Sequence, residues 1–222
     1  MKLINQLPKW IELGAALLAF IAGFINAVGL LSFEHQSVSH LSGTATLVGI
    51  AAQDVNFTLL FKLAGIIVAF VIGAVIAGIF IDSRDLKLGR HYDTLLFFEA
   101  ILILLAIHFL DNNVMWGQMT LSMACGIQNA MATRYSGAII RTTHLTGIFT
   151  DIGIMIGSYL KGEEFDHRKF WLFFLIVIGF IIGGVIAAPL FTFIGYHSLY
   201  IPFGLCISLA ALYRYHTRKL LQ

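Results

Sequence analysis

Long apolar runs recur along this chain, and they constrain its fold more than any other feature. A helix needs about 20 predominantly apolar residues to cross the hydrocarbon core of a bilayer. Since little chain is left between the runs, the sequence predicts an all-α integral membrane protein with about six transmembrane helices. The runs are Ile11–Leu31, Leu59–Ile81, Leu95–Leu110, Val114–Ala132, Trp171–Phe193 and Tyr200–Tyr213.

The composition excludes several other classes of protein. The chain is 59% hydrophobic and 12% charged, whereas a soluble domain has about 45–50% and about 25%. Its net charge of +2 is too small to indicate a nucleic-acid partner. Cys125 and Cys206 lie inside apolar runs without metal-type spacing, so we expect packing residues. The run after Lys2 and Lys9 is long and lacks a clear cleavage site, which predicts a retained first helix.

Three blocks of sequence occur in the same order in both halves of the chain. Similarity at a nearly fixed offset predicts two related halves, about residues 8–110 and 113–214, within a single membrane domain 1–222. Ser/Thr exchanges in the second block keep the hydroxyl group. The paired blocks are Gly23–Ala27 with Gly126–Ala130, Ser39–Ile50 with Thr143–Ile154, and Phe70–Ala77 with Phe180–Ala187.

The second block decides the predicted topology. As a helix, Ser39–Gln53 would reach about 22 Å, which is short of the roughly 30 Å hydrocarbon core, so we expect a re-entrant segment. Its counterpart Thr142–Leu160 is long enough to cross, so length leaves that segment open. If neither segment crosses and both termini are cytoplasmic, the halves form an inverted 3+3 repeat, and the outside is left almost without Lys or Arg.

Loop charge favours this topology over one in which both segments cross. Crossing would move the loop around Arg84–Arg90 outside, against the positive-inside bias. In the re-entrant arrangement the cytoplasmic loops hold Lys2 and Lys9, then Arg84, Lys87 and Arg90, then Arg134 and Arg141, then Lys161, Arg168 and Lys169, then Arg214, Arg218 and Lys219.

His40 and His144 occupy matching places in the re-entrant segments. Imidazole can donate, accept and titrate near neutral pH, so both are candidates for substrate contact or proton relay. The alternative is that each ties its loop to a neighbouring helix. We expect helices to begin near Ser42-Gly43 and Thr146-Gly147, with hydroxyls able to cap them and free backbone N–H groups facing the midplane from both sides.

Five further polar residues join the candidate substrate-binding set. Asn26 and Asn129 would line a path or bond the exposed backbone of the re-entrant segments. Gln128 has no counterpart in the first half. Arg141 would favour an anionic solute or serve as a topogenic interfacial charge, and Asp151 could carry a proton or pair with Arg141.

The paired motifs resemble the YoaK family of bacterial inner-membrane proteins, a domain of unknown function. The resemblance rests on Gly23–Ala27 with Ser39–Gly49, and on Gly126–Ala130 with Arg141–Gly153, and it covers nearly the whole chain. Where many members have Thr-Gly-Asn, this chain reads Ser42-Gly43-Thr44. The resemblance implies the bacterial inner membrane, about six spans and an unassigned activity, and it supplies no substrate.

These features favour a small-solute transporter or channel, with a path between the paired re-entrant segments. A membrane scaffold or accessory subunit is the alternative, because a polar interior can be purely structural. An intramembrane enzyme is disfavoured since HExxH, Cys/His metal spacing and the Gly-x-Ser-x-Gly elbow are absent from the sequence. We therefore expect no enzyme activity and no cofactor or metal. The expected partners are the lipid bilayer, a solute or ion, and in one alternative a second copy.

Overall fold

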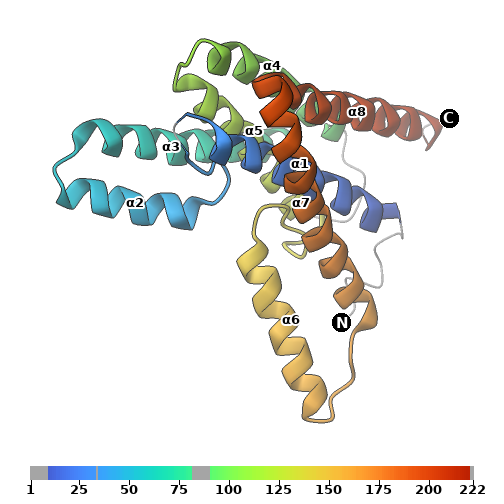
Figure 1. Cartoon of the computed structure of the whole chain (residues 1–222). Helices are drawn as coiled ribbons and strands as arrows, with labels where there is room; N and C mark the ends of the chain where they lie inside the picture. The colour runs from blue at the N-terminus through green and yellow to red at the C-terminus, as the bar shows by residue number, and fades with distance from the viewer. Residues whose placement is uncertain (1–9, 34, 82–90, 221–222) are drawn as a thin grey trace.

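The computed structural model describes residues 10–33, 35–81 and 91–220, and every regular element in these ranges is a helix (Figure 1). The predicted charges at Lys2, Lys9 and Arg84–Arg90 lie outside the described residues. The elements are α1 (Trp10–Leu31), α2 (Leu41–Gln53), α3 (Phe57–Phe80), α4 (Tyr92–Asp111), α5 (Trp116–Tyr135), α6 (Leu145–Leu160), α7 (His167–Ile194), the 3-10 helix η2 (Gly195–Leu199) and α8 (Tyr200–Leu220).

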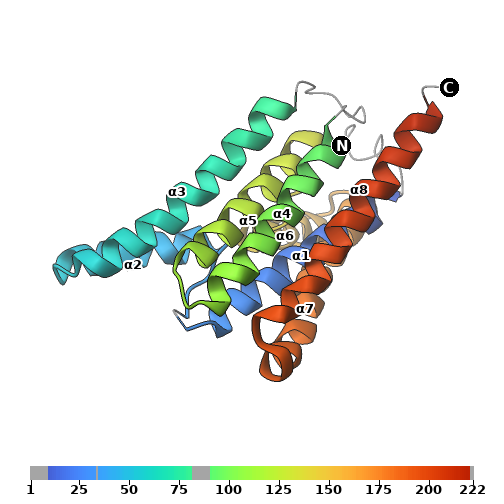
Figure 2. The ribbon, with the colours of Figure 1, turned by 90° about the horizontal axis from the view of Figure 1, so that it is seen from above.

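Four helical stretches are long and apolar enough to cross a membrane: Trp10–Leu31, Phe57–Phe80, Tyr92–Asp111 and His167–Tyr215. The last of these contains α7 and most of α8, joined by η2. The expectation of an all-helical, membrane-embedded protein is confirmed in this form. Helix α5 has the same length as α4 but is more polar. Helices α3 and α4 both pack against α5, and α8 packs against α4. The four helices run roughly parallel to one another in Figure 2.

Two helix crossings, α1 with α7 and α3 with α5, hold the bundle together. At the first, a Cβ at Gly23 would overlap the carbonyl oxygen of Phe180. At the second, a Cβ at Gly126 would overlap the carbonyl oxygen of Phe70 in the same way. Small residues allow such close backbone approach between membrane helices. The two crossings therefore use matching residues from the repeated blocks.

The partner helices contribute a second pair of glycines to these crossings. A Cβ at Gly73 would overlap the carbonyl oxygen of Met123, and one at Gly183 would overlap that of Phe20. From the sequence, Gly73, Gly78, Gly183 and Gly184 are predicted to be positions of close helix packing, and this is confirmed at Gly73 and Gly183. It is wrong at Gly78, where no atom lies within 4 Å of an added Cβ, because that glycine lies on the exposed face of α3 while its neighbour Ala77 is buried.

One end of the bundle, which we call the Glu12 face, joins the starts of α1 and α7 to the ends of α3 and α5. Glu12 pairs with Arg168 at 3.2 Å, and Arg134 donates to the backbone oxygen of Ile81 at 3.2 Å. An apolar cluster that includes Ile11 and Ala132 connects these two contacts. Three tyrosine rings from α5, α4 and α8 pack together near this face. The ring of Tyr92 meets that of Tyr135 edge-on and that of Tyr213 at a tilt, with ring centroids 5.7 Å apart in both pairs.

The opposite end, which we call the Asp111 face, joins the ends of α1 and α4 to the start of α5 and to η2. Gln118 donates to the hydroxyl of Ser32 at 2.6 Å. The carboxylate of Asp111 lies 3.8 Å from the ring of His197, and the hydroxyl of Tyr196 accepts from a backbone N–H at the end of α1. Helices α1, α4 and α5 therefore each run from one face to the other.

Helices α2 and α6 stand apart from this bundle. Each lies beside the long helix that follows it, α3 or α7, and the two diverge from each other in Figure 1. Only Thr44 and Ala51 of α2, and only Ile148 of α6, are buried. Both helices are therefore attached mainly through their amino-terminal loops.

The close crossing at Gly126 predicts that a single methyl group there destabilises the fold. Gly126→Ala should lower the free energy of unfolding by about 1–3 kcal/mol, because the backbone of α3 must move to admit it. Gly78→Ala is the matched control, since the site is open and alanine favours helix by up to about 1 kcal/mol. Thermal unfolding in detergent compares them, and equal melting temperatures would contradict the role of the crossing.

Candidate functional site

His40 and His144 occupy equivalent positions at the starts of two helices. Each is the N-cap residue, immediately before Leu41 of α2 and Leu145 of α6, and each side chain is exposed. The helices thus begin about one residue earlier than the sequence predicted. Neither histidine makes a side-chain capping bond, so the backbone N–H groups of both first turns stay available for another partner.

Both histidine rings fold over a glycine three residues further on. A Cβ at Gly43 would lie 3.2 Å from Nδ1 of His40, and a Cβ at Gly147 would overlap the ring of His144. In the first half, Oγ of Ser42 also lies 3.2 Å from Nε2 of His40. The glycines are therefore required to seat the rings against the helix starts.

The expectation that Ser42 and Thr146 cap the helices is wrong. Both are the second residue of their helix, so their hydroxyls lie past the N-cap position. Their backbone oxygens instead accept from the hydroxyls of Thr46 at 3.0 Å and Thr150 at 2.9 Å. The two helix starts thus share their local hydrogen bonds as well as their sequence.

Asn26 fixes the loop that leads into α2. Its Oδ1 accepts from the hydroxyl of Ser37 at 2.6 Å, and from the backbone N–H and hydroxyl of Ser39 at 3.3 and 3.0 Å. Asn26 itself is 8% exposed. Asn26 therefore bonds the backbone of the loop that precedes α2, which was one of its two predicted roles, and His40 lies one residue beyond this anchor.

In the second half, Gln128 makes the equivalent tie. Its amide donates to the hydroxyl of Thr142 at 2.9 Å and to the backbone oxygen of Leu18 at 2.8 Å. By contrast, Oδ1 of Asn129 is buried and has no hydrogen-bond partner among the described residues. The matching asparagines therefore do not act alike, because the neighbouring glutamine has the longer reach.

Both loop anchors meet on helix α1. Asn26 belongs to α1, and Gln128 bonds to α1 at Leu18, eight residues earlier. Eight residues of helix correspond to about 12 Å along the axis. The structure thus brings the bases of the two loops to one helix, while the bodies of α2 and α6 diverge.

Arg141 and Asp151 are both half-buried, before and within α6. The expected pairing between them is wrong, since the salt bridges of the described residues include no such pair. Asp151 lies in the second turn of α6, beyond the loop that carries Arg141. Across the described part of the chain, no group of three or more His, Cys, Asp or Glu residues could hold a metal ion.

A family model described as "Protein of unknown function (DUF1275)" matches residues 14–212. The chain belongs to this DUF1275 family. YoaK is a DUF1275 member, so the resemblance drawn from the paired motifs is confirmed at the level of the family. No curated protein and no solved structure matches the chain. The family assignment therefore leaves the activity open.

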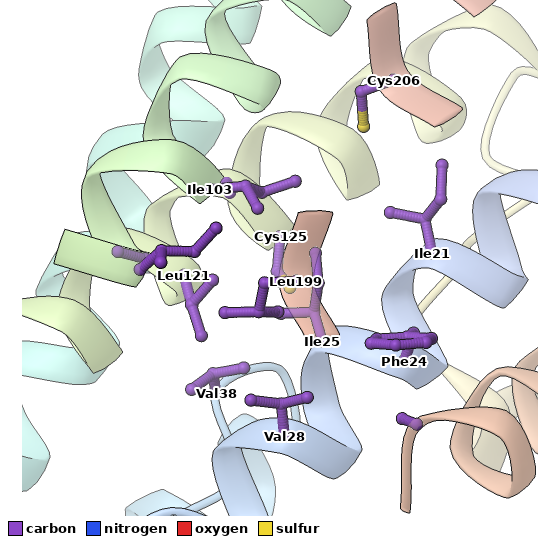
Figure 3. Close-up of a cluster of buried hydrophobic side chains, with 14 of the residues drawn as sticks. Ile21, Phe24, Ile25, Val28, Val38, Ile103, Leu121, Cys125, Leu199 and Cys206 are labelled. Atoms are coloured by element: carbon purple, nitrogen blue, oxygen red, sulfur yellow. The ribbon is translucent and has the colours of Figure 1, made fainter. Parts of the chain in front are cut away.

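Glu99, a carboxyl group that is completely buried in this DUF1275 protein, was not identified from the sequence. Glu99 of α4 is 0% exposed, and neither carboxyl oxygen has a hydrogen-bond partner among the described residues. The thiols of Cys125 from α5 and Cys206 from α8 face it, within the apolar cluster of Figure 3. The available signal was a single acidic residue inside the run Leu95–Leu110, where any charge is costly.

The unequal roles of the two asparagines can be measured. Asn26→Ala should lower the free energy of unfolding by about 1–3 kcal/mol, because Ser39 loses the acceptor for its backbone N–H. Asn129→Ala, the matched variant of the second half, should cost distinctly less since its side-chain oxygen has no partner. Thermal unfolding in detergent would refute the assignment if Asn129→Ala were the more damaging change.

Proposed function

We propose that this DUF1275 protein moves a small solute or ion across a bacterial inner membrane, as a transporter or channel. The observation that carries the proposal is the pair of uncapped helix starts, α2 and α6, each with a histidine ring seated on a glycine. Helix starts that lie within the membrane and offer free N–H groups are typical of solute sites in transporters.

The packing of the long helices supports an inverted repeat. The first helix of each half packs against the third helix of the other half, α1 on α7 and α5 on α3. Both crossings use glycines from the repeated blocks, Gly23 and Gly126. Exchange of equivalent helices between halves is the arrangement expected for two repeats of opposite orientation, which many secondary transporters share.

The distribution of charge supports a cytoplasmic Glu12 face. Arg134 and Arg168 bond at this face, whereas Asp111 and His197 lie at the opposite one. Since cytoplasmic loops are rich in Lys and Arg, both termini would be cytoplasmic and the Asp111 face external. Helix α6 follows the end of α5 and precedes the start of α7, which both lie at the Glu12 face, so it would re-enter without crossing. By the same reasoning α2 would re-enter from the outside.

The chemistry of the helix starts favours an anionic solute. Backbone N–H groups and the positive end of the helix dipole attract anions, and half-buried Arg141 precedes α6 with no carboxylate partner among the described residues. His40 and His144 add donors that can also exchange protons. Asn26, Asn129, Gln128 and Asp151 complete the proposed substrate-binding set.

A membrane scaffold is the second candidate, and one observation favours it. Helix α6 leaves several large apolar side chains uncovered, among them Phe149 at 54% and Ile154 at 61% exposed. Lipid covers such a face in a transporter, whereas a partner subunit or second copy would cover it in a scaffold. An intramembrane enzyme ranks below both.

The proposed topology predicts which positions are reached from each side of the membrane. Asp54→Cys should react with an impermeant maleimide in intact cells, and Ala138→Cys only after permeabilisation, because neither α2 nor α6 crosses. If both crossed, the two results would be exchanged. Glu163→Cys is the control, since it is internal in either arrangement. The two native cysteines are buried, so they add little background.

Solute binding predicts a rise in melting temperature. A ligand that binds only the folded state stabilises it by RT ln(1 + [L]/Kd), about 2.7 kcal/mol at 100 times Kd. In a panel of inorganic anions, carboxylates, amino acids, nucleobases and metals, an anion should raise the melting temperature in detergent. His40→Ala and His144→Ala should each abolish the shift. A metal as the only stabiliser would favour the enzyme, and no shift with both variants destabilised would favour structural histidines.

A further inference from the structure

Glu99 is a carboxyl group in the interior of a membrane helix, and the donor that faces it is the thiol of Cys206, which is too weak a donor to stabilise its charge. It lies in the second turn of α4, is completely buried, and both of its oxygens lack a hydrogen-bond partner among the described residues. An ionised carboxylate in such surroundings costs many kcal/mol, whereas the protonated acid is tolerated. The geometry therefore requires a neutral Glu99 in this conformation.

Among the described residues, no Lys or Arg side chain from the helices packed on α4 lies close to Glu99. Helix α5 presents the thiol of Cys125 and α8 that of Cys206, and thiols are weak donors. The other titratable groups lie at the two ends of α4, about 10 Å and about 18 Å away along its axis. At the Glu12 face these groups include Arg134, Tyr135, Tyr213 and Asp93 around Tyr92. At the opposite face they include His197 and Asp111.

The position of α8 gives Glu99 a route to water. Helix α8 packs mainly on α4 and only slightly on α1 and η2, and it lies at the edge of the bundle in Figures 1 and 2. The thiol of its Cys206 faces the carboxyl group of Glu99, and Figure 3 shows Cys206 beside the apolar cluster of the bundle. A separation of α8 from α4 at the Glu12 face, about 10 Å from Glu99 along α4, would connect the carboxyl group to water and leave the glycine crossings of α1 with α7 and α3 with α5 intact.

We propose that Glu99 is a proton-binding site, which holds a proton while α8 covers it and releases that proton to water when α8 moves away. This inference deepens the proposed function, on which its role as the coupling site rests, because it names the proton as the coupling ion. No bond other than O–H is made or broken, and water accepts the released proton. An intramembrane carboxyl that cycles between a covered neutral form and an open ionised form is a means of coupling proton movement to transport.

Dicyclohexylcarbodiimide tests this proposal directly, because it adds to protonated carboxyl groups in apolar surroundings. In the full chain in detergent, peptide mass spectrometry should find the adduct on Glu99, with labelling that falls as the pH is raised from acidic to alkaline values, since opening then releases the proton. Glu99→Gln should remove the adduct, whereas Asp93→Asn, on the same helix near the Glu12 face, should leave it. An unlabelled Glu99 at every pH in folded wild-type protein would overturn the proposal.

Thermal unfolding gives an independent readout. The native state holds a proton that the unfolded chain releases, so the stability of the wild type relative to Glu99→Gln should fall as pH rises over the same range. A difference that does not change with pH would overturn the proposal. If Glu99→Gln fails to fold, Glu99→Asp keeps the carboxyl group for labelling. Neither readout needs a solute, so failure of the transport proposal would leave both intact.

Discussion

Close backbone contact at two glycine-lined crossings is the constraint on which the rest of the structure depends. In a bilayer, apolar surface gives helices little reason to associate, because lipid is equally apolar. Gly23 and Gly126 instead let backbones approach until a single added carbon would overlap a carbonyl oxygen. Each crossing joins a helix of one half to a helix of the other. The halves therefore cannot fold as independent units, and the long helices of both are held in one bundle.

Helices α2 and α6, which pack weakly on the bundle, are held in place by hydrogen bonds at their loops. Because α2 and α6 have few buried residues of their own, packing gives them little stability. Polar ties at their loops, made by Asn26 and Gln128, attach them to the bundle near α1 instead. A short, loosely packed helix on a fixed loop can change its angle at small energetic cost, while its first turn keeps its position.

The apolar periodicity and the repeat spacing predicted most of the helices but only part of the candidate site. The apolar runs located the long helices α1, α3, α4, α5, α7 and α8 of the described residues, and the repeated blocks identified Gly73 and Gly183 as packing positions, since both signals are local in sequence. Side-chain reach is not local. Nothing in the pattern showed that Gln128, rather than Asn129, would bond the second loop, or that the N-cap positions would be the histidines. Glu99 was overlooked because one acidic residue barely changes the hydropathy of a long apolar run.

The interior of the bundle contains an excess of acceptors. Besides Glu99, the side-chain oxygens of Gln118, Gln128 and Asn129 are buried without a partner among the described residues, and all three of these amides belong to α5. Buried acceptors are seldom left unpaired, so these amide oxygens favour a ligand that donates hydrogen bonds, such as water or a protonated group of a solute. The helix starts of α2 and α6 offer donors and favour an anion. An anion bound there and a proton bound to Glu99 would together be neutral. A neutral pair crosses a low-dielectric interior at a much smaller Born cost than either ion alone.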